Sequence, residues 1–224
     1  MNWSPIILSL QLAFVTTVIL FLIAIPIAKW LSETTSKIKP VVEALISLPL
    51  VLPPTVLGFY ILIAFSPNNS FGHWLDQTLG IQLIFSFPGL VFASILYSLP
   101  FMIQPIQAGL SNLSLNMKES SCVLGKSKWK TMLMVLLPNI RTSILTGIVL
   151  SFAHTIGEFG VVLMIGGNIP GVTKVASIAI YDEVESLNYA AAHEYAIVLL
   201  LLTFGILVTV YSLNKRLNLT GNYA

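Results

Sequence analysis

Five long apolar stretches constrain the fold of this chain more than any other feature of its sequence. They cover residues 6–29, 42–65, 87–108, 139–165 and 192–213. Each has about 22–27 residues, and about 20 helical residues are enough to cross the hydrocarbon core of a bilayer. The sequence therefore predicts an all-α membrane protein with about five transmembrane helices.

The composition indicates one membrane domain. Hydrophobic residues make up 56% of the chain and charged residues 9%, whereas a soluble domain has about 25% charged residues. We therefore expect residues 1–224 to form a single transmembrane domain. The first apolar stretch lacks a basic start and is too long for the h-region of a signal peptide, so we do not expect it to be cleaved.

The placement of the basic residues predicts the orientation of the spans. Ten of the eleven Lys and Arg residues fall in or at the edges of the connections after the first and third spans, or after the fifth; only Lys174 falls on the other side. Cytoplasmic connections carry such an excess of positive charge. We therefore expect the amino terminus outside, the carboxyl terminus inside and residues 109–138 in the cytoplasm.

Motifs for catalysis, metal binding and nucleotide binding are weak. His73 and His193 lack partners at metal-ligand spacing, and Cys122 is the single cysteine. Gly125-Lys126-Ser127 resembles the end of a Walker A loop, but Ser120 stands where that motif needs its first glycine. We therefore expect no enzymatic activity, metal or cofactor in this chain, and no nucleic-acid partner.

Three prolines interrupt the second apolar stretch. Pro49, Pro53 and Pro54 donate no N–H, so carbonyls one turn earlier lose their helical partners. Inside a bilayer such groups are tolerated only against protein or a water-filled cavity. The prolines predict either a kink that helps the helices pack or a bend that lines a pathway, and both place this span inside the bundle.

Polar and small residues recur along one predicted face of the fourth apolar stretch. Their helical spacing fits a single face that includes Ser143, Gly147, Ser151, His154 and Glu158. This face can line a translocation pathway with Pro53 and Pro54, or it can pack closely against another helix. An anionic Glu158 would repel an oxyanion, so we expect this residue to accept hydrogen bonds from the backbone or to pair with His154.

The predicted outside segment 166–185 begins with a glycine-rich turn. Backbone N–H groups around Asn168 and Gly171 could form an anion-binding concavity, and Lys174 could attract an oxyanion or an acidic partner. The alternative is an ordinary turn with a solvated lysine. The apolar residues 175–181 are too few to span a bilayer, so a shallow re-entrant or interfacial helix fits them better.

The predicted cytoplasmic segment 109–138 carries the strongest functional signal. Two short amphipathic helices separated by Gly125, the second ending near Pro138, could dock into a groove of a partner. The residues that could form this coupling loop are Glu119, Ser120, Ser121, Leu124 and Gly125. A basic helix attracted to anionic lipid would explain the lysines but not the glycine.

This segment resembles the cytoplasmic "EAA" loop of ABC importer permeases, although Ser120 and Ser121 stand where that loop has alanines. Residues 48–54, 157–160 and 168–171 extend the resemblance, which is strongest to molybdate permease subunits of the ModB type. It implies the type I importer fold, with a cytoplasmic coupling helix and alternating access. Sulfate, thiosulfate and tungstate permeases are similar. A proton-coupled carrier with His154 and Glu158 as its relay is the alternative outside this family.

The resemblance also implies partners and a location. It implies a second copy of the chain, two ATPase subunits that bind ATP and Mg²⁺, an extracytoplasmic oxyanion-binding protein and surrounding membrane lipid. It places the chain in a bacterial or archaeal plasma membrane as a multi-pass protein.

Overall fold

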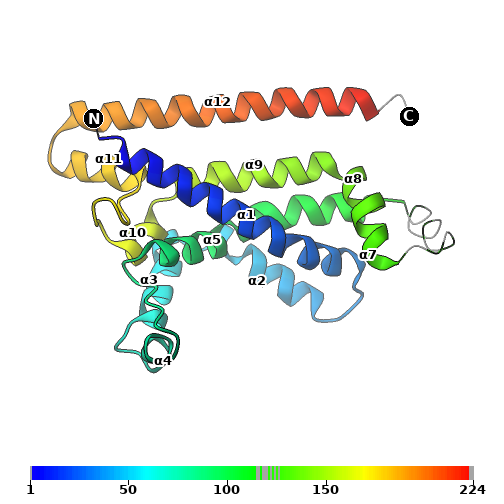
Figure 1. Ribbon diagram of the computed structural model, residues 1–224, viewed down its shortest axis with the longest axis horizontal. Helices are drawn as coiled ribbons and strands as arrows, with labels where there is room; N and C mark the ends of the chain where they lie inside the picture. Colours follow the sequence, from blue (N-terminus) through cyan, green and yellow to red (C-terminus); the bar gives the residue numbers. More distant parts are fainter. Residues whose placement is uncertain are drawn as a thin grey trace.

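Three long helices form the centre of the molecule: α1 (Ser4–Glu33), α5 (Phe87–Ser111) and α9 (Arg141–Gly157), which pack on one another (Figure 1). The computed structural model describes residues 2–114, 117, 121, 123, 125 and 127–221, with the side chains of Leu79 and of residues 213–221 left out. Leu20, Ala24, Ala28 and Leu31 lie on one buried stripe of α1. The alanines in this stripe let α5 approach α1 closely.

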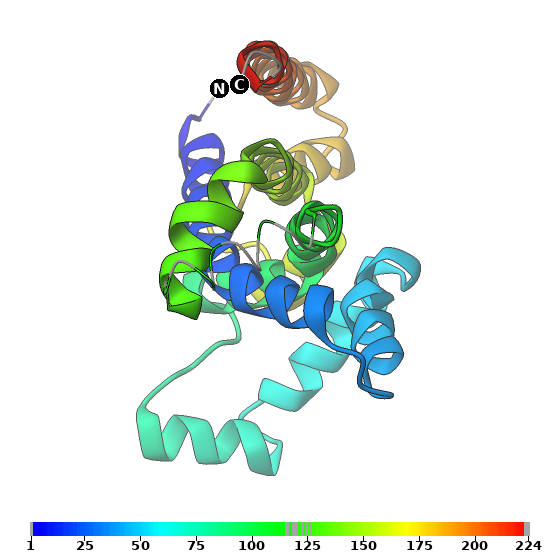
Figure 2. The same ribbon diagram turned by 90° about the vertical axis from the view of Figure 1, so that its right-hand side faces the viewer.

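The long carboxyl-terminal helix α12 (Tyr189–Gly221) lies on one side of the bundle, where it packs on α9 and on the short helix α11 (Ala176–Glu185). Figure 2 shows α12 opposite α2, α3 and α4, with α5 and α9 between them. Leu200, Leu201 and Phe204 on α12 are exposed. This apolar surface suits contact with lipid.

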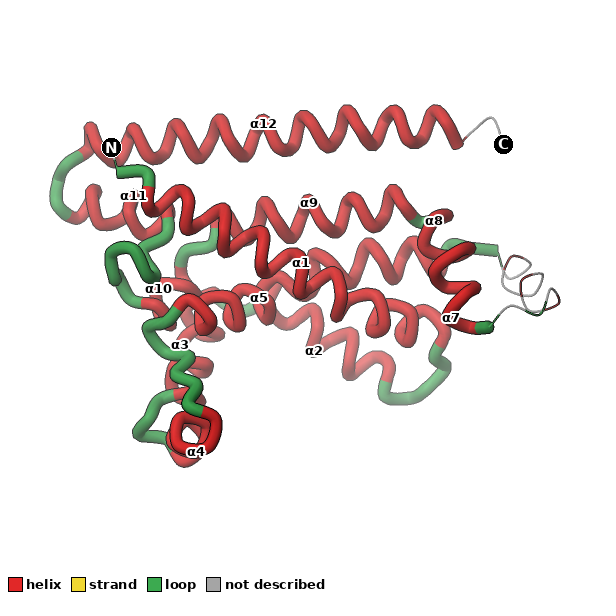
Figure 3. The backbone as a smooth tube through the Cα atoms, in the orientation of Figure 1, coloured by secondary structure: helices red, strands yellow, loops and turns green. Residues whose placement is uncertain are grey.

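The helical composition and the number of spans agree with the sequence. Figure 3 shows helices joined by loops throughout the part of the chain that is described. α1, α5 and residues 189–212 of α12 are long and apolar enough to cross a membrane, and two bent helix pairs raise the number of candidate spans to five. The predicted all-α membrane fold is confirmed.

The second span is broken rather than kinked. α2 (Lys39–Val51) and α3 (Pro54–Phe65) meet at an angle of 111°, and Leu52 and Pro53 are extended between them. Pro53 and Pro54 cannot donate the N–H groups that a continuous helix needs. The short helix α4 (Ser70–Leu79) follows α3 and is capped by the side chain of Asn69.

The fourth predicted span is divided more strongly than expected. Three short elements precede it: α7 (Lys128–Thr131), a π-helical turn η1 (Met132–Leu136) and α8 (Leu137–Asn139). Pro138, which has no N–H to donate, follows the π-helical turn. Together these elements meet α9 at an angle of 78°. α9 ends at Gly157, and α10 (Gly160–Gly166) begins after the extended Glu158. The prediction of one continuous helix over residues 139–165 is therefore wrong. Glycines on both sides of the break disfavour a helix there.

The predicted cytoplasmic connections lie at one end of the bundle. In Figure 1 the end of α1, the α7 region and the end of α12 are together, while the amino terminus and the loop between α10 and α11 lie at the opposite end. Apart from the loop that carries Lys174, the described chain segments with basic residues therefore share one end, as the charge pattern predicts.

Candidate functional site

A pocket of about 550 Å³ lies where the two helix breaks meet. It is bounded by the start of α3, by α5, by the end of α9 and by α10. Four polar side chains line it, and the rest of its described lining is apolar or glycine; the polar residues are Thr55, Tyr97, His154 and Glu158. Two of these four come from the predicted pathway face. Pro54, which was also predicted as a pathway residue, lines this pocket too.

Glu158 occupies an unusual position in this pocket. Its side chain is only 4% exposed, and among the residues that the structure describes neither carboxyl oxygen has a hydrogen-bond partner. Ser94, a buried hydroxyl that also lacks a partner there, lies beside this carboxyl group. The backbone carbonyl of Glu158 instead accepts a hydrogen bond of 2.6 Å from the hydroxyl of Ser177 on α11. That bond anchors the break between α9 and α10.

Glu158 neither pairs with His154 nor accepts a hydrogen bond from the described backbone, so both forms of the expectation for this residue are wrong. The Nδ1 of His154 lies 2.9 Å from the hydroxyl of Ser98 on α5, which also contacts the hydroxyl of Thr155 at 3.1 Å. The imidazole ring stacks on Phe101 with ring centroids 4.1 Å apart. These contacts fix the orientation of the ring. Glu158 does not continue the helical face of Ser151 and His154, because α9 ends at Gly157.

The other residues of the predicted pathway face lie in helix contacts. A Cβ atom on Gly147 would approach the carbonyl oxygen of Met102 to 3.1 Å, and one on Gly109 would approach the Ser143 hydroxyl to 2.6 Å. Ser151 is fully buried. These positions favour the packing interpretation for Ser143, Gly147 and Ser151. Pro53 is exposed at the start of α3 and is not among the pocket residues.

Two glycines bring α3 and α10 into close contact beside the pocket. A Cβ atom on Gly58 would lie 2.7 Å from the Cβ of Met164, and one on Gly160 would lie 2.9 Å from the Cβ of Pro54. Real side chains do not approach so closely, so only glycine fits at both positions. The short helices that follow the two breaks therefore pack as a unit.

A second polar region, between α2 and α5, was not predicted. Gln107 donates a hydrogen bond of 2.6 Å to Glu43, and Gln104 donates one of 3.1 Å to Ser47, around a cavity of about 210 Å³. The signal was present in the sequence, because the two α2 residues are four apart and the two α5 residues are three apart. Residues with these spacings share a helix face.

The predicted coupling loop is described only in part. Glu119, Ser120 and Leu124 lie outside the described residues. Ser121 is buried and its hydroxyl lies 2.8 Å from that of Thr131 on α7. Gly125 has a φ of +71°, a conformation that L residues rarely adopt and that fits its predicted role as a break.

Apolar side chains that precede and follow this glycine in the sequence are exposed. They include Val123, Trp129, Leu133 and Met134, which are between 59% and 86% exposed. Exposed apolar side chains of this kind suit contact with a partner protein or with lipid.

The predicted outside loop is tied to α11 through one carboxylate. Asp182 forms an ion pair with Lys174 and accepts a hydrogen bond of 3.0 Å from the side chain of Asn168. The Lys174 ammonium group holds the pKa of Asp182 below its ordinary value. Gly171 has a φ of +75° at the exposed tip of the loop. Lys174 is therefore not the solvated cation that the turn interpretation predicted, and much of its charge is balanced.

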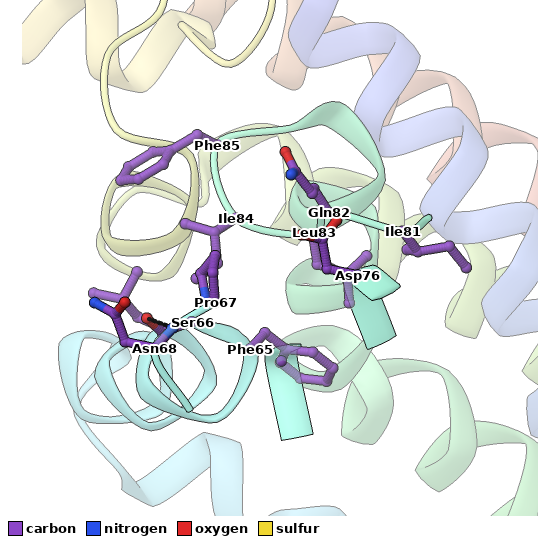
Figure 4. A pocket seen from close by; sticks show the side chains of 12 residues that line it. Phe65, Ser66, Pro67, Asn68, Asp76, Ile81, Gln82, Leu83, Ile84 and Phe85 are labelled. Carbon is purple, nitrogen blue, oxygen red and sulfur yellow. Dashed lines mark hydrogen bonds between the residues drawn. The ribbon is translucent and has the colours of Figure 1, made fainter. Parts of the chain in front are cut away.

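A further pocket of about 420 Å³ lies near α4, in the connection that the sequence predicts to be outside. Figure 4 shows its walls, which come from the end of α3, from α4 and from residues 81–85. Asp76 contributes a carboxyl group to an otherwise largely apolar lining. An acidic group makes this pocket a poor candidate for an anion. Among the described residues, no group of three His, Cys, Asp or Glu side chains could hold a metal ion.

Sequence comparison identifies the relatives of this chain. Residues 21–219 match the family described as "Binding-protein-dependent transport system inner membrane component". The chain is 46% identical to the molybdenum transport system permease protein ModB of Azotobacter vinelandii, over 92% of this chain and 91% of that protein. It is 30% identical to ModB of Escherichia coli (83% and 81% covered) and 32% identical to the E. coli sulfate transport system permease protein CysT (80% and 64% covered).

Solved structures show the same fold at low sequence identity. A chain of a bacterial ABC transporter involved in alginate import superposes with a TM-score of 0.79 at 18% identity, covering 95% of this chain and 78% of that chain. A chain of the MetNI methionine ABC transporter superposes with a TM-score of 0.72 at 14% identity, covering 95% and 94%. The arrangement of broken and continuous helices is therefore that of ABC importer permeases.

Proposed function

This chain belongs to the family of binding-protein-dependent transport system inner membrane components, and from that premise we propose that it carries molybdate across the membrane. The observation that carries the substrate assignment is the 46% identity to a molybdenum permease over 92% of the chain. The chain is a multi-pass inner membrane protein of an ABC transporter, which works with an ATPase and a periplasmic binding protein. It is not itself an enzyme.

The proposed assembly contains two copies of the chain and two ATPase subunits, with the amino terminus of each copy outside. The charge pattern supports this orientation, because basic connections remain in the cytoplasm. The exposed apolar side chains on either side of Gly125 in the sequence then form the surface that the ATPase grips. Trp129 and Leu133 would enter a groove of that partner. Glu119, Ser120, Ser121 and Leu124 belong to the same proposed coupling loop.

The proposed pathway runs along the side of the bundle that faces away from α12. The pocket at the two helix breaks and the polar region around Glu43 and Gln104 both involve α5, one toward each end of the bundle. Polar groups in a membrane domain normally face its interior or a wet cavity rather than lipid. We propose alternating access, in which ATP-driven closure of the ATPases is transmitted to the α3–α10 unit.

The loop that contains Asn168, Gly171 and Lys174 lies at the proposed outer end, where the binding protein would dock. Its attachment to Asp182 supports a structural role. Because the ion pair balances much of the charge of Lys174, long-range attraction of an oxyanion by this lysine is weakened.

Reconstitution tests the proposed function. Proteoliposomes that contain the chain, its ATPase and its binding protein should accumulate radiolabelled molybdate when ATP is supplied, and a tenfold excess of unlabelled tungstate and sulfate should reveal the order of preference. Because a sulfate permease is 32% identical to this chain, sulfate is the required competitor. Preferential uptake of sulfate would contradict the substrate assignment. Uptake driven by a proton gradient without ATP would contradict the importer assignment and support a secondary carrier.

A further inference from the structure

We propose that the hydrogen bond between Ser121 and Thr131 fastens the proposed coupling loop to the turn that enters the helix bundle, and that these two residues are positioning residues for energy coupling. This inference rests on the proposed function, in which an ATPase acts on residues 109–138. It adds the contact through which movement of the loop reaches the transmembrane helices.

The bond joins two buried hydroxyl groups. The Oγ atom of Ser121 and the Oγ1 atom of Thr131 lie 2.8 Å apart, although ten residues separate them in the sequence. Their side chains are 4% and 6% exposed. Both hydroxyl groups have lost contact with water, so removal of one partner takes away a bond that water cannot readily replace. The chain between them contains Gly125 with its positive φ, and the bond closes this stretch into a loop.

Thr131 leads directly into a turn that is packed in the bundle. It is the last residue of α7, and the π-helical turn η1 begins at the next residue, Met132. Met132 and Leu136 are 1% and 2% exposed, and they belong to the cluster that contains Leu110 of α5 and Leu31 of α1. Closely packed side chains transmit a displacement rather than absorb it. A shift of Thr131 would therefore reach α1 and α5.

The same short stretch also has exposed apolar side chains. Trp129, Leu133 and Met134 are between 59% and 72% exposed, whereas Thr131 and Met132 between them are buried. An ATPase that bound the exposed side chains would press on an element whose buried residues are anchored in the bundle. Because Ser121 is bonded to this element, the proposed coupling loop and the turn would move together.

The amount of molybdate accumulated per ATP hydrolysed tests this role, because a bond that served the fold alone would lower uptake and hydrolysis in proportion. The complete transporter, with its ATPase and binding protein, is reconstituted in proteoliposomes. Ser121→Ala should lower the ratio by about fivefold or more, the equilibrium factor that corresponds to one buried hydrogen bond. Thr131→Ser keeps a hydroxyl group and should retain most of the ratio. Ser111→Ala removes an exposed hydroxyl group at the end of α5 and should leave the ratio unchanged.

A double variant, Ser121→Ala with Thr131→Val, separates coupling from stability. It leaves neither hydroxyl group unpaired, so the complex should unfold at a higher temperature than the Ser121→Ala complex. Its ratio of uptake to hydrolysis should stay low, because the bond is still absent. Recovery of the ratio together with the unfolding temperature would overturn the proposal, since the bond would then serve only the fold.

The remaining outcomes separate this role from the proposed function. An unchanged ratio in Ser121→Ala, or a proportional loss of uptake and hydrolysis, overturns the positioning role even if the parent transporter accumulates molybdate. If Ser121→Ala does not assemble, the double variant decides, and a ratio equal to that of the parent would contradict the role. A parent that takes up sulfate in preference to molybdate refutes the substrate assignment, and the same ratios are then measured with sulfate.

Discussion

Replacing Gly58 by alanine should loosen the contact between α3 and α10. The added Cβ would lie 2.7 Å from the Cβ of Met164 and 3.2 Å from the Cα of Val161. Neither atom can move by rotation of a side chain, because a Cβ is fixed by its own backbone. The two helices must therefore separate by several tenths of an ångström.

The magnitude follows from two opposing effects. Overpacking of a tight contact costs about 1–3 kcal/mol, and exchanging glycine for alanine inside a helix gains about 1 kcal/mol. Gly205 on α12 provides the matched control, because nothing that the structure describes lies within 4 Å of a Cβ added there. Gly205→Ala should gain the helix term alone, so the two variants should differ by about 1–3 kcal/mol.

Thermal unfolding of the purified complex measures this difference. Unfolding of such assemblies is often irreversible, so the two variants must be heated at the same rate. Gly58→Ala should unfold at a lower temperature than Gly205→Ala, and uptake should fall with it if the α3–α10 unit moves as one piece. Equal unfolding temperatures for the two variants would refute the close contact.

Three further predictions concern other parts of the chain. Ser98→Ala should destabilise the complex by about 1–3 kcal/mol because it leaves His154 Nδ1 unpaired; a thermal shift no larger than that of the exposed Ser212→Ala would contradict this. Since the pKa of Asp182 is lowered in the folded protein, its ion pair should protect the outside loop from hydrogen exchange at neutral pH. This protection should fall only below about pH 4, and Asp182→Asn should remove that acid dependence. Gly125→Val should reduce uptake more than ATP hydrolysis; the same exchange at Gly80, which also has positive φ, should not.

Much of the architecture could be predicted because membrane insertion depends on composition and charge, which are local properties of the sequence. The apolar lengths predicted the spans, and the prolines before Thr55 predicted a disruption of the second one. The 111° angle could not be predicted, since it depends on the packing of α3 against α10 through Gly58.

The polar site was harder to predict than the fold. Ser98, which binds His154, is 56 residues away in the sequence, and no local pattern connects the two. The partner of Lys174 was equally hidden, because Asp182 reaches it only through the turn before α11. The α9 face was predicted as if the helix continued through Glu158, and the break changed which residues share a surface.

That break explains why Glu158 lies in the pocket at all. In a continuous helix Glu158 would follow His154 on the face that packs against α5, where Ser151 and Gly147 are buried. The extended backbone at Glu158, anchored by the Ser177 hydroxyl, instead brings this residue to the pocket at the start of α3, with its carboxyl group buried beside Ser94. Two interrupted helices therefore bring the start of α3 and a buried carboxyl group close to one pocket.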